Sequence, residues 1–292
     1  MTKILDGKQL SATLKAEIKE TVAKRLAQGK KAPHLAAVLV GNDGASLTYV
    51  GSKVRACEAI GFQSTLIRLE ESITEATLLS EIQQLNDNPE IDGYIVQLPL
   101  PKHIDEERIL LAVDPKKDVD GFHPANFGRM ALELPTFIPA TPFGIMEMLE
   151  RYEVETSGKH CVVIGRSHIV GRPISILMSQ KGPAGNATVT LTHSRTQNIA
   201  ALTKQADIVV SALGIPEFLK ADMVKPGAVI IDVGITRVPD ESHPKGYVIK
   251  GDVAYHELLP VVSAITPVPG GVGPMTIAML LKNTLLACER RD

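Results

Sequence analysis

The sequence lacks the features that mark disulfide-rich, zinc-binding and nucleic-acid-binding proteins. Its three cysteines, Cys57, Cys161 and Cys288, are widely separated and form no C-x-x-C pair, so neither a disulfide framework nor a zinc site is expected. The 31 Lys and Arg residues are balanced by 33 Asp and Glu, which gives a net charge of −2, and no basic run occurs. A dedicated nucleic-acid surface is therefore not expected.

Long apolar runs are also missing. The first residues, MTKILDGKQL, contain no apolar core of the kind found in signal peptides. No stretch approaches the roughly 20 apolar residues of a membrane span. We therefore expect a cytoplasmic protein without a membrane or nucleic-acid partner. At 292 residues, with 44% hydrophobic and 22% charged residues, the chain has an ordinary globular composition and is long enough for two domains.

Helical and strand patterns alternate along the first half of the chain. Apolar residues recur every four positions from Leu10 to Leu26, which predicts an amphipathic helix that stops at Gly29. Further strands and helices are predicted, in chain order, at 34–40 (strand), 45–61 (helix), 63–69 (strand), 74–86 (helix) and 91–101 (a strand running into a proline-rich loop). This alternation predicts a mostly parallel sheet covered by helices.

A second α/β series follows a loop rich in Gly and Pro over residues 114–142. Thr141 is predicted to cap a helix in which Pro142 is the first residue. Short runs rich in Val and Ile predict strands buried on both faces, at 159–165, 187–193, 206–214 and 228–235. The chain ends with a Gly/Pro loop that enters an apolar helix within 265–288. The domain boundary is predicted near residue 140.

The first strand of the second series runs into a glycine loop. Gly165 and Gly171 flank Ser167 in a variant of the dinucleotide pattern G-x-G-x-x-G. The strand–turn–helix context favours a pyrophosphate at the helix N-terminus, and an ordinary strand-to-helix turn is the alternative.

The next strand ends in HSRT, residues 193–196, without the carboxylate that binds the ribose hydroxyls of NAD. Arg195, together with Arg166 in the glycine loop, matches a 2′-phosphate, which predicts NADP rather than NAD. The alternative is that Arg195 is a solvated surface charge.

Tyr49 and Lys53 form a Tyr-x-x-x-Lys pair, which is the catalytic signature of short-chain dehydrogenases. On a helix this spacing places both side chains on one face. In short-chain dehydrogenases the pair follows the glycine loop within the same domain, whereas here it lies far upstream of that loop. This order excludes the short-chain class, and an exposed structural pair is the remaining alternative.

Several longer motifs resemble those of bifunctional methylenetetrahydrofolate dehydrogenase/methenyltetrahydrofolate cyclohydrolase. In chain order they include VGNDGASLTYVGSKVRACEAIGF, DGYIVQLPLP, DPKKDVDGFHP, VVIGRSHIVGRP, ATVTLTHSRT and ITPVPGGVGPMT. The resemblance covers nearly the whole length. It implies NADP-dependent oxidation of 5,10-methylenetetrahydrofolate to the 5,10-methenyl form, followed by hydrolysis to 10-formyltetrahydrofolate.

The resemblance also assigns roles to particular positions. Lys53 would be the central cyclohydrolase residue, Tyr49 would stack on the folate, and Gln97 would tune the lysine. Asp120 would hold the pterin ring. The other positions assigned to the folate are Leu98, Pro269, Gly270 and Gly271. Those assigned to NADP are Gly165, Arg166, Ser167, Ser194 and Ile235, with Arg166 and Ser194 at the 2′-phosphate.

A lysine suits the hydrolysis for a physical reason. Its reference pKa of about 10.4 makes it a poor base in water. Partial desolvation and a cationic substrate would both lower its pKa toward neutrality. The alternative for Lys53 is a surface lysine that keeps its charge in water.

From these features we predict an α/β protein of two domains with a cleft between them. Residues 1–139 plus 270–292 would form the folate-binding catalytic domain, and residues 140–269 a Rossmann-type parallel-sheet domain for NADP. The resemblance implies a homodimer formed through the dinucleotide domain, and we predict no metal. Alternatives are a cyclohydrolase without redox activity, a non-catalytic folate-binding protein and a dehydrogenase of another small substrate.

Two positions depart from the family pattern, which often has Cys at Ala140 and Asn at Thr236. Of the acids near Asp120, both Asp114 and Asp118 are interpreted as loop-structuring or solvated. Three histidines near the motifs have no metal-ligand spacing and are interpreted as local hydrogen-bonding residues: His123, His168 and His193.

Overall fold

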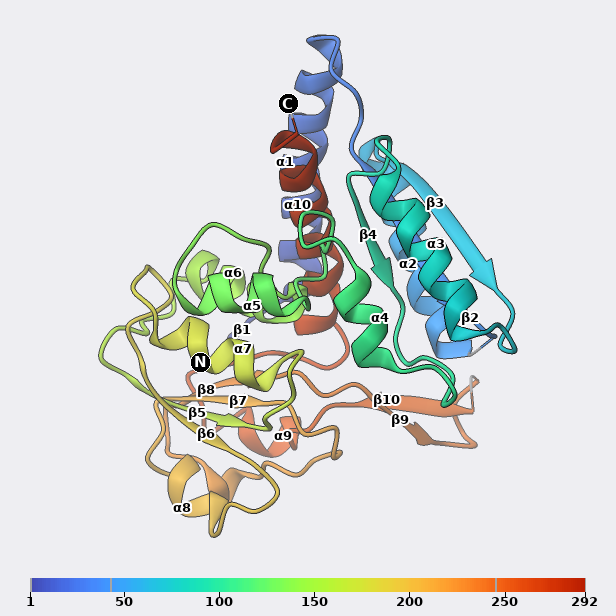
Figure 1. Cartoon of the computed structure of the whole chain (residues 1–292). Coiled ribbons are helices and arrows are strands. Elements are labelled where there is room, and N and C mark those ends of the chain that lie inside the picture. The colour runs from blue at the N-terminus through green and yellow to red at the C-terminus, as the bar shows by residue number, and fades with distance from the viewer. Residues whose placement is uncertain (1, 43, 245, 292) are drawn as a thin grey trace. The chain divides into compact units, whose positions relative to one another are not determined.

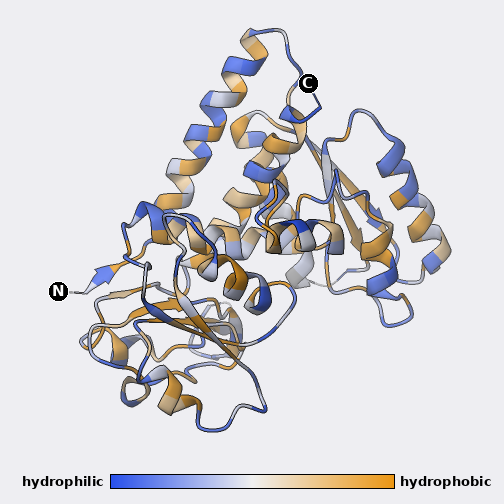
Figure 2. Cartoon of the chain, turned by 60° about the vertical axis from the view of Figure 1, so that its left-hand side comes forward, coloured by the Kyte–Doolittle hydropathy of each residue, from blue (hydrophilic) through white to orange (hydrophobic). Residues whose placement is uncertain are grey.

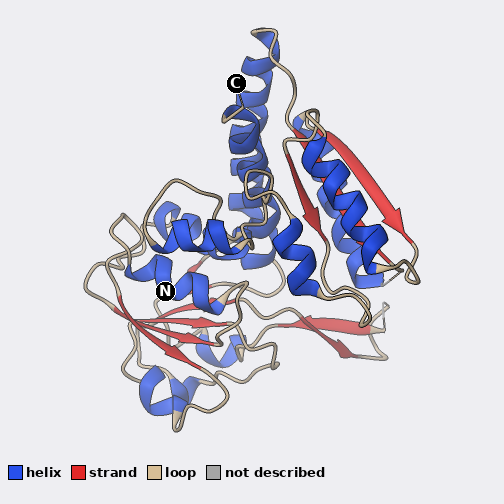
Figure 3. Cartoon of the chain, viewed as in Figure 1, coloured by secondary structure: helices blue, strands red, loops and turns tan. Residues whose placement is uncertain are grey.

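The computed structural model describes residues 2–42, 44–244 and 246–291 (Figures 1 and 3). The chain divides into two compact units: unit 1, residues 1–11 and 141–276, and unit 2, residues 12–140 and 277–292. The division near residue 140 is as predicted. Residues 1–11 and 270–276, however, group with unit 1, although we expected them in the other domain.

Backbone pairing explains this difference. The two-residue strand β1 (Lys3–Ile4) is parallel to β11 (Ala264–Ile265) in the sheet of unit 1. The N–H of Leu5 donates to the carbonyl of Ile265 at 2.9 Å, and that of Lys8 donates to the carbonyl of Gly270 at 2.8 Å. A strand of two residues is too short to show a sequence pattern. Its pairing partner lies near the other end of the chain, so local sequence does not indicate the pairing either.

Unit 1 is built on a six-stranded parallel sheet in the order β1-β11-β8-β7-β5-β6. The predicted Val/Ile-rich runs form its other strands, β5 (His160–Ile164), β6 (Thr188–Thr192), β7 (Ile208–Ser211) and β8 (Val229–Asp232). All residues of β7 and nearly all of β5 and β8 are buried, as expected for strands covered on both faces. Sheet strands are mostly orange in the hydropathy view of Figure 2.

Helices cover both faces of this sheet. Figure 1 shows α7 (Gly171–Ser179) on one face, with α8 (Ile199–Thr203) and α9 (Tyr255–Leu258) on the other. Val209, Ile230 and Leu258 belong to the apolar cluster between α9 and the sheet. The remaining elements of the second series are α6 (Ala140–Arg151), the 3₁₀ helix η1 (Ala221–Met223) and an antiparallel hairpin of β9 (Thr236–Pro239) and β10 (Tyr247–Lys250).

Two details of unit 1 differ from the sequence expectation. The first is that α6 begins at Ala140, so Thr141 is inside the helix rather than its cap. The Thr141 hydroxyl instead lies 3.0 Å from that of Thr276. The second is the β9–β10 hairpin, which was not predicted from the sequence because its strands are only partly buried and mix charged with apolar residues.

Unit 2 contains a three-stranded parallel sheet in the order β3-β2-β4. The predicted bounds hold for β2 (His34–Val40) and β3 (Gln63–Leu69), and β4 (Gly93–Val96) is the strand part of the segment 91–101 that was predicted to run into a proline-rich loop. Prolines at 99 and 101 cannot donate to a sheet, which ends the strand.

The helices of unit 2 include α2 (Gly44–Ile60), α3 (Glu75–Asp87), α4 (Glu106–Ala112) and α5 (Pro124–Ala131). Long helices α1 (Gly7–Ala27) and α10 (Val272–Glu289) begin in unit 1 and continue in unit 2. Leu78 and Ile82 of α3 pack on Val38 and Tyr94 of the sheet. The helix α5 falls in the segment expected to be loop. Among the described residues, none of the helices combines the length and apolar character that crossing a membrane requires.

Candidate active site

Three of the predicted residues meet in unit 2, between α2 and the end of β4. Lys53 and Tyr49 lie one turn apart on α2, and the Lys53 Nζ is 5.5 Å from the centroid of the Tyr49 ring. Gln97 directly follows β4, and its N–H donates to the carbonyl of Val38 at 2.9 Å. The Lys53 ammonium donates to Gln97 Oε1 at 3.1 Å. Residues from two distant parts of the sequence thus form one group.

The lysine in this group is not a surface lysine. Its residue is only 6% exposed, which contradicts the alternative of a solvated side chain. The Gln97 amide donates from Nε2 to the carbonyl of Leu98 at 2.7 Å, which orients Oε1 toward the amine. Lys53 is therefore buried beside a neutral, fixed acceptor. Such a partner orients the amine without adding a negative charge that would stabilise the ammonium form.

The titratable groups here influence one another. Burial lowers the pKa of Lys53, and the charge of Asp120 opposes this with a smaller effect. Burial raises the pKa of Asp120 to about 6, against the attraction of Lys53, and the charge of Asp118 raises it further. Burial and then Asp120 also raise the pKa of the Tyr49 phenol. A lysine and a carboxyl whose pKa values both move toward neutrality can exchange protons with a ligand.

Asp118 and Asp120, in the loop before α5, differ in their hydrogen bonds. Asp118 is 5% exposed and accepts hydrogen bonds from the N–H groups of Gly121 (3.1 Å) and His123 (2.8 Å) and from the Asn126 amide (2.9 Å). Asp118 therefore structures the loop, as predicted. The Asp120 carboxylate is half-buried and makes no hydrogen bond or ion pair with any described residue, so its oxygens are available to a ligand.

A residue that sequence reasoning missed supports this loop. Asn283 is 1% exposed on α10, and its amide donates to the carbonyls of Val119 (2.8 Å) and Ile138 (2.9 Å). It thereby ties the residue before Asp120 to the segment before α6. The signal in the sequence was a lone asparagine in the apolar run TIAMLLKNTLLAC.

The cofactor residues predicted from the glycine loop lie at the carboxyl edge of the unit 1 sheet. Strand β5 has β6 on one side and β7 on the other, so the chain changes direction across the sheet at β5. Ligands of doubly wound sheets bind at this kind of switch point. Gly165 has φ +113°, and a Cβ there would lie 2.2 Å from the carbonyl oxygen of Ala212, so glycine is needed.

The residues predicted to bind the 2′-phosphate are close to this loop. The N–H of Gly165 donates to the carbonyl of Thr192 at 3.1 Å, which joins the glycine loop to the end of β6. After β6, residues 193–196 form a tight turn in which the Thr196 hydroxyl accepts from the N–H of His193 at 2.9 Å. Ser194, Arg195 and Arg166 are all exposed at this edge, and neither arginine forms an ion pair with a described residue.

The Ser167 and Ile235 side chains have different surroundings. The Ser167 hydroxyl accepts from the N–H groups of Val170 (3.2 Å) and Gly171 (3.3 Å) at the start of α7. Ile235, just after β8, is 52% exposed, which is high for a large apolar residue. An exposed apolar side chain at this edge provides a surface for a ring.

Pro269, Gly270 and Gly271 belong to unit 1, whereas Tyr49, Lys53, Gln97, Leu98 and Asp120 belong to unit 2. The loop is held at the start of α1, where a Cβ on Gly7 would lie 1.8 Å from the carbonyl oxygen of Gly271. That all eight residues line one folate site therefore stays a prediction.

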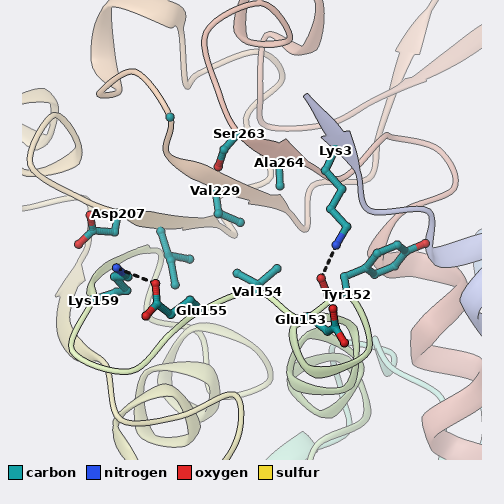
Figure 4. A pocket seen from close by; sticks show the side chains of 12 residues that line it. Lys3, Tyr152, Glu153, Val154, Glu155, Lys159, Asp207, Val229, Ser263 and Ala264 are labelled. Carbon is teal, nitrogen blue, oxygen red and sulfur yellow. Dashed lines mark hydrogen bonds and ion pairs between the residues drawn. The ribbon is translucent and has the colours of Figure 1, made fainter. Parts of the chain in front are cut away.

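A pocket of about 350 Å³ lies at the opposite, amino-terminal edge of the unit 1 sheet (Figure 4). Its Lys159 pairs with Glu155 at 3.0 Å, and Lys3 donates to the carbonyl of Tyr152. It contains none of the predicted site residues, and parallel sheets bind ligands at the other edge. We therefore do not assign it to the reaction. Within the described residues, no group of three or more His, Cys, Asp or Glu side chains is arranged to hold a metal ion.

The sequence of this chain matches those of known proteins along nearly its whole length. Residues 5–120 match the family model for the tetrahydrofolate dehydrogenase/cyclohydrolase catalytic domain, and residues 139–292 match that for the NAD(P)-binding domain. The bifunctional protein FolD of Flavobacterium johnsoniae is 70% identical over 289 residues, which is 99% of this chain and 98% of that protein.

Solved structures give the same result. The FolD methylenetetrahydrofolate dehydrogenase/cyclohydrolase of Campylobacter jejuni is 45% identical with a TM-score of 0.94, and the whole of each chain is covered. The Trypanosoma brucei enzyme, solved with NADP cofactor and an inhibitor, is 38% identical with a TM-score of 0.94, covering 99% of this chain and 98% of that one. The chain therefore belongs to the tetrahydrofolate dehydrogenase/cyclohydrolase family.

Proposed function

We infer that the chain catalyses two consecutive steps on a folate-bound one-carbon unit. It is a bifunctional enzyme that oxidises 5,10-methylenetetrahydrofolate to 5,10-methenyltetrahydrofolate with NADP and then hydrolyses the product to 10-formyltetrahydrofolate. The observation that supports the second step most directly is the buried Lys53 beside the neutral acceptor Gln97. An intact glycine loop argues against a cyclohydrolase without redox activity.

The first step needs orientation rather than a strong base. The folate nitrogens beside the methylene carbon supply electrons as the hydride leaves, and NADP accepts that hydride when bound. In this proposal the backbone around Gly165 and Ser167 receives the pyrophosphate, and Arg166 and Ser194 receive the 2′-phosphate. Ile235 supports the nicotinamide ring. These residues thus fix the orientation of the nicotinamide, and such orientation can contribute much of the rate enhancement.

The second step needs proton transfer, and Lys53 is placed to perform it. Water adds to the methenyl carbon, and the proton that it loses passes to the neutral Lys53 amine. The same group returns a proton to the ring nitrogen released when the ring opens. Because burial lowers the pKa of Lys53, a larger fraction is neutral before the reaction than for a solvated lysine.

The remaining residues of the group bind and orient the substrate. The free carboxylate oxygens of Asp120 can accept two hydrogen bonds from the amino and N–H edge of the pterin. The Tyr49 ring stacks along the folate, and Leu98 and Pro269–Gly271 complete its binding surface. We further expect a homodimer formed through the NADP-binding domain and a cytoplasmic location, with folates as the small-molecule partners.

A spectral time course tests this proposal, because reduced nicotinamide and the methenyl intermediate can be followed separately. Purified enzyme is given 5,10-methylenetetrahydrofolate with NADP, and then with NAD. We expect NADPH to form without lasting methenyl accumulation, beyond a control for non-enzymatic hydrolysis. Persistent 5,10-methenyltetrahydrofolate would contradict the cyclohydrolase activity, and absence of NADPH would contradict the dehydrogenase activity.

Cofactor preference is tested by the substitution Arg166→Ala. We expect the KM for NADP to rise by about tenfold or more, because a charge-assisted hydrogen bond contributes about 1.5–3 kcal/mol. The KM for NAD, which has no 2′-phosphate, serves as the internal control and should change little. An equal change for both cofactors would contradict the assignment of Arg166 to the 2′-phosphate.

A further inference from the structure

Unit 1 contains two buried carboxylates that the reaction scheme above does not use. Asp232, the last residue of β8, is 3% exposed, and Asp252, shortly before α9, is fully buried. The N–H of Asp252 donates to Asp232 Oδ1 at 2.9 Å, so one residue lies directly against the other. Neither forms an ion pair with any described Lys, Arg or His. We refer to Asp232 and Asp252 as the acid pair.

Each member of the acid pair holds a different loop. Asp232 accepts from the N–H groups of Gly234 (2.9 Å) and Val253 (3.1 Å), just beyond β8 and before α9. Asp252 Oδ2 accepts from the N–H groups of Leu213 (2.6 Å) and Gly214 (3.2 Å), just beyond β7. Asp252 Oδ1 is buried without a hydrogen-bond partner among the described residues.

These loops belong to the carboxyl edge at which the cofactor residues lie. The loop that begins at Ala212 packs against Gly165, and Gly234 directly precedes Ile235. The packing is tight, because a Cβ on Gly234 would lie 2.3 Å from Asp252 Oδ1 and one on Gly251 would lie 1.9 Å from Asp232 Oδ2. The acid pair thus touches the backbone on which the nicotinamide would rest.

In the part of the chain that the structure describes, no Lys, Arg or His forms an ion pair with the acid pair, and the side chains next to it are neutral or engaged elsewhere. Ser211 of β7, in register with Asp232, and Thr266 after β11 are neutral and buried. Lys250 of β10 pairs with Glu217, and His256 of α9 is exposed. Burial and then the charge of Asp252 raise the pKa of Asp232 to about 7.

We propose that Asp252 is a positioning residue for hydride transfer: the acid pair fixes the loops at Leu213–Gly214 and Gly234–Ile235 in the geometry that receives the nicotinamide. This rests on the proposed NADP site, which it deepens by naming the residues that hold that site in shape. Ionisation of Asp232 as the pH rises places its charge next to that of Asp252, and the repulsion between them weakens the hold on both loops.

The test compares the two activities of one enzyme. The substitution Asp252→Ala should raise the KM for NADP and lower dehydrogenase kcat/KM at least tenfold. Hydrolysis of 5,10-methenyltetrahydrofolate supplied directly, without NADP, should stay within twofold, because Lys53 and Gln97 are in unit 2. The control Asp222→Ala, at an exposed acid of unit 1, should change neither activity. Dehydrogenase kinetics within twofold of the parent in Asp252→Ala would overturn the proposal.

The isosteric change Asp252→Asn separates positioning from general damage to the fold. Its amide oxygen can still accept from Leu213 and Gly214, so dehydrogenase activity near pH 7 should stay within threefold of the parent. NADP affinity is then measured by calorimetry from pH 6 to 9. The parent should bind more weakly as pH rises through this range, whereas Asp252→Asn, which lacks the charge of Asp252, should show a smaller dependence.

Ionisation of the 2′-phosphate is common to both proteins and cancels in this comparison. Equal pH dependence of NADP affinity in the parent and in Asp252→Asn would overturn the proposal. This comparison still tests the proposal if Asp252→Ala misfolds and loses both activities. A parent enzyme that forms no NADPH would instead contradict the proposed function. The two failures are therefore distinguishable.

Discussion

Lys53 and Lys117 are buried to the same extent in unit 2, each 6% exposed, and burial lowers the pKa of both. Their hydrogen bonds differ. Lys117 donates to the carbonyls of Leu85 (2.7 Å) and Asn88 (2.6 Å) at the C-terminal end of α3, whereas the one acceptor of Lys53 within the described parts of the chain is the Gln97 amide oxygen. A positive charge at the last carbonyls of a helix stabilises that end.

The comparison shows that a lowered pKa does not by itself mark a catalytic lysine. Lys117 has its donors engaged by fixed backbone acceptors, which makes it part of the fold. Among the described residues the Lys53 ammonium has a single hydrogen-bond acceptor, and the unpaired carboxylate of Asp120 is near enough to affect its pKa. We therefore assign stability to Lys117 and proton transfer to Lys53. Three substitutions test this division.

The largest effect is expected for Lys53→Met. Removing the proton carrier should lower hydrolysis of 5,10-methenyltetrahydrofolate by at least about 100-fold, the lower range for general acid–base catalysis. The free energy of unfolding should change by less than about 1 kcal/mol, because one hydrogen bond to a neutral amide is lost. Coupled assays should then show NADPH formation with methenyl accumulation. The control Lys19→Met, at an exposed lysine, should hydrolyse the substrate at the parent rate. Hydrolysis at the parent rate in Lys53→Met would contradict the proposed role of Lys53 in proton transfer.

The converse is expected for Lys117→Met. It leaves the carbonyls of Leu85 and Asn88 without their donor, so urea unfolding should show a loss of about 2–3 kcal/mol. Under conditions in which the variant is folded, hydrolysis should stay within about threefold of the parent, since this lysine contacts none of the proposed site residues. A large loss of activity in a fully stable Lys117→Met protein would contradict the assignment of Lys117 to stability alone.

A smaller effect is expected for Gln97→Glu, which gives Lys53 an ionised partner. The added negative charge favours the ammonium form and so raises the pKa of Lys53. Hydrolysis at pH 7 should fall about tenfold per pKa unit, and the rate should recover as pH rises and the amine is again deprotonated. The pH–rate profile of the parent is the reference. A profile that does not move toward higher pH would show that Lys53 does not act as a neutral base.

Much of the fold could be predicted from the sequence where periodicity is strong. Strands β2 and β3 have the predicted bounds: β2 is a continuous apolar run that ends at Gly41, and β3 lies between Gly61 and the polar residues that begin at Glu70. The short elements were missed, among them α5 and the β9–β10 hairpin. The assignment of residues 1–11 was wrong because β1 pairs with β11, and no local pattern reports a partner so far along the chain.

The candidate site was predictable to a similar degree. The spacing of Tyr49 and Lys53 placed them on one helix face, and the resemblance supplied Gln97 and Asp120. Asn283 and the acid pair were not found, because their importance depends on burial and on hydrogen bonds between segments far apart in sequence. A buried polar residue becomes visible only when the surrounding backbone is known.

The central claim is that Lys53 is neutral often enough to act as a base. Its titration can be measured directly by heteronuclear NMR of isotope-labelled lysine side chains, with Lys53→Met identifying the signal. The account predicts a pKa below the reference value of about 10.4, with the Gln97→Glu protein titrating at higher pH than the parent. A Lys53 that titrates at or above the reference value in the parent would contradict it, because the group would then stay an ammonium ion throughout the working range.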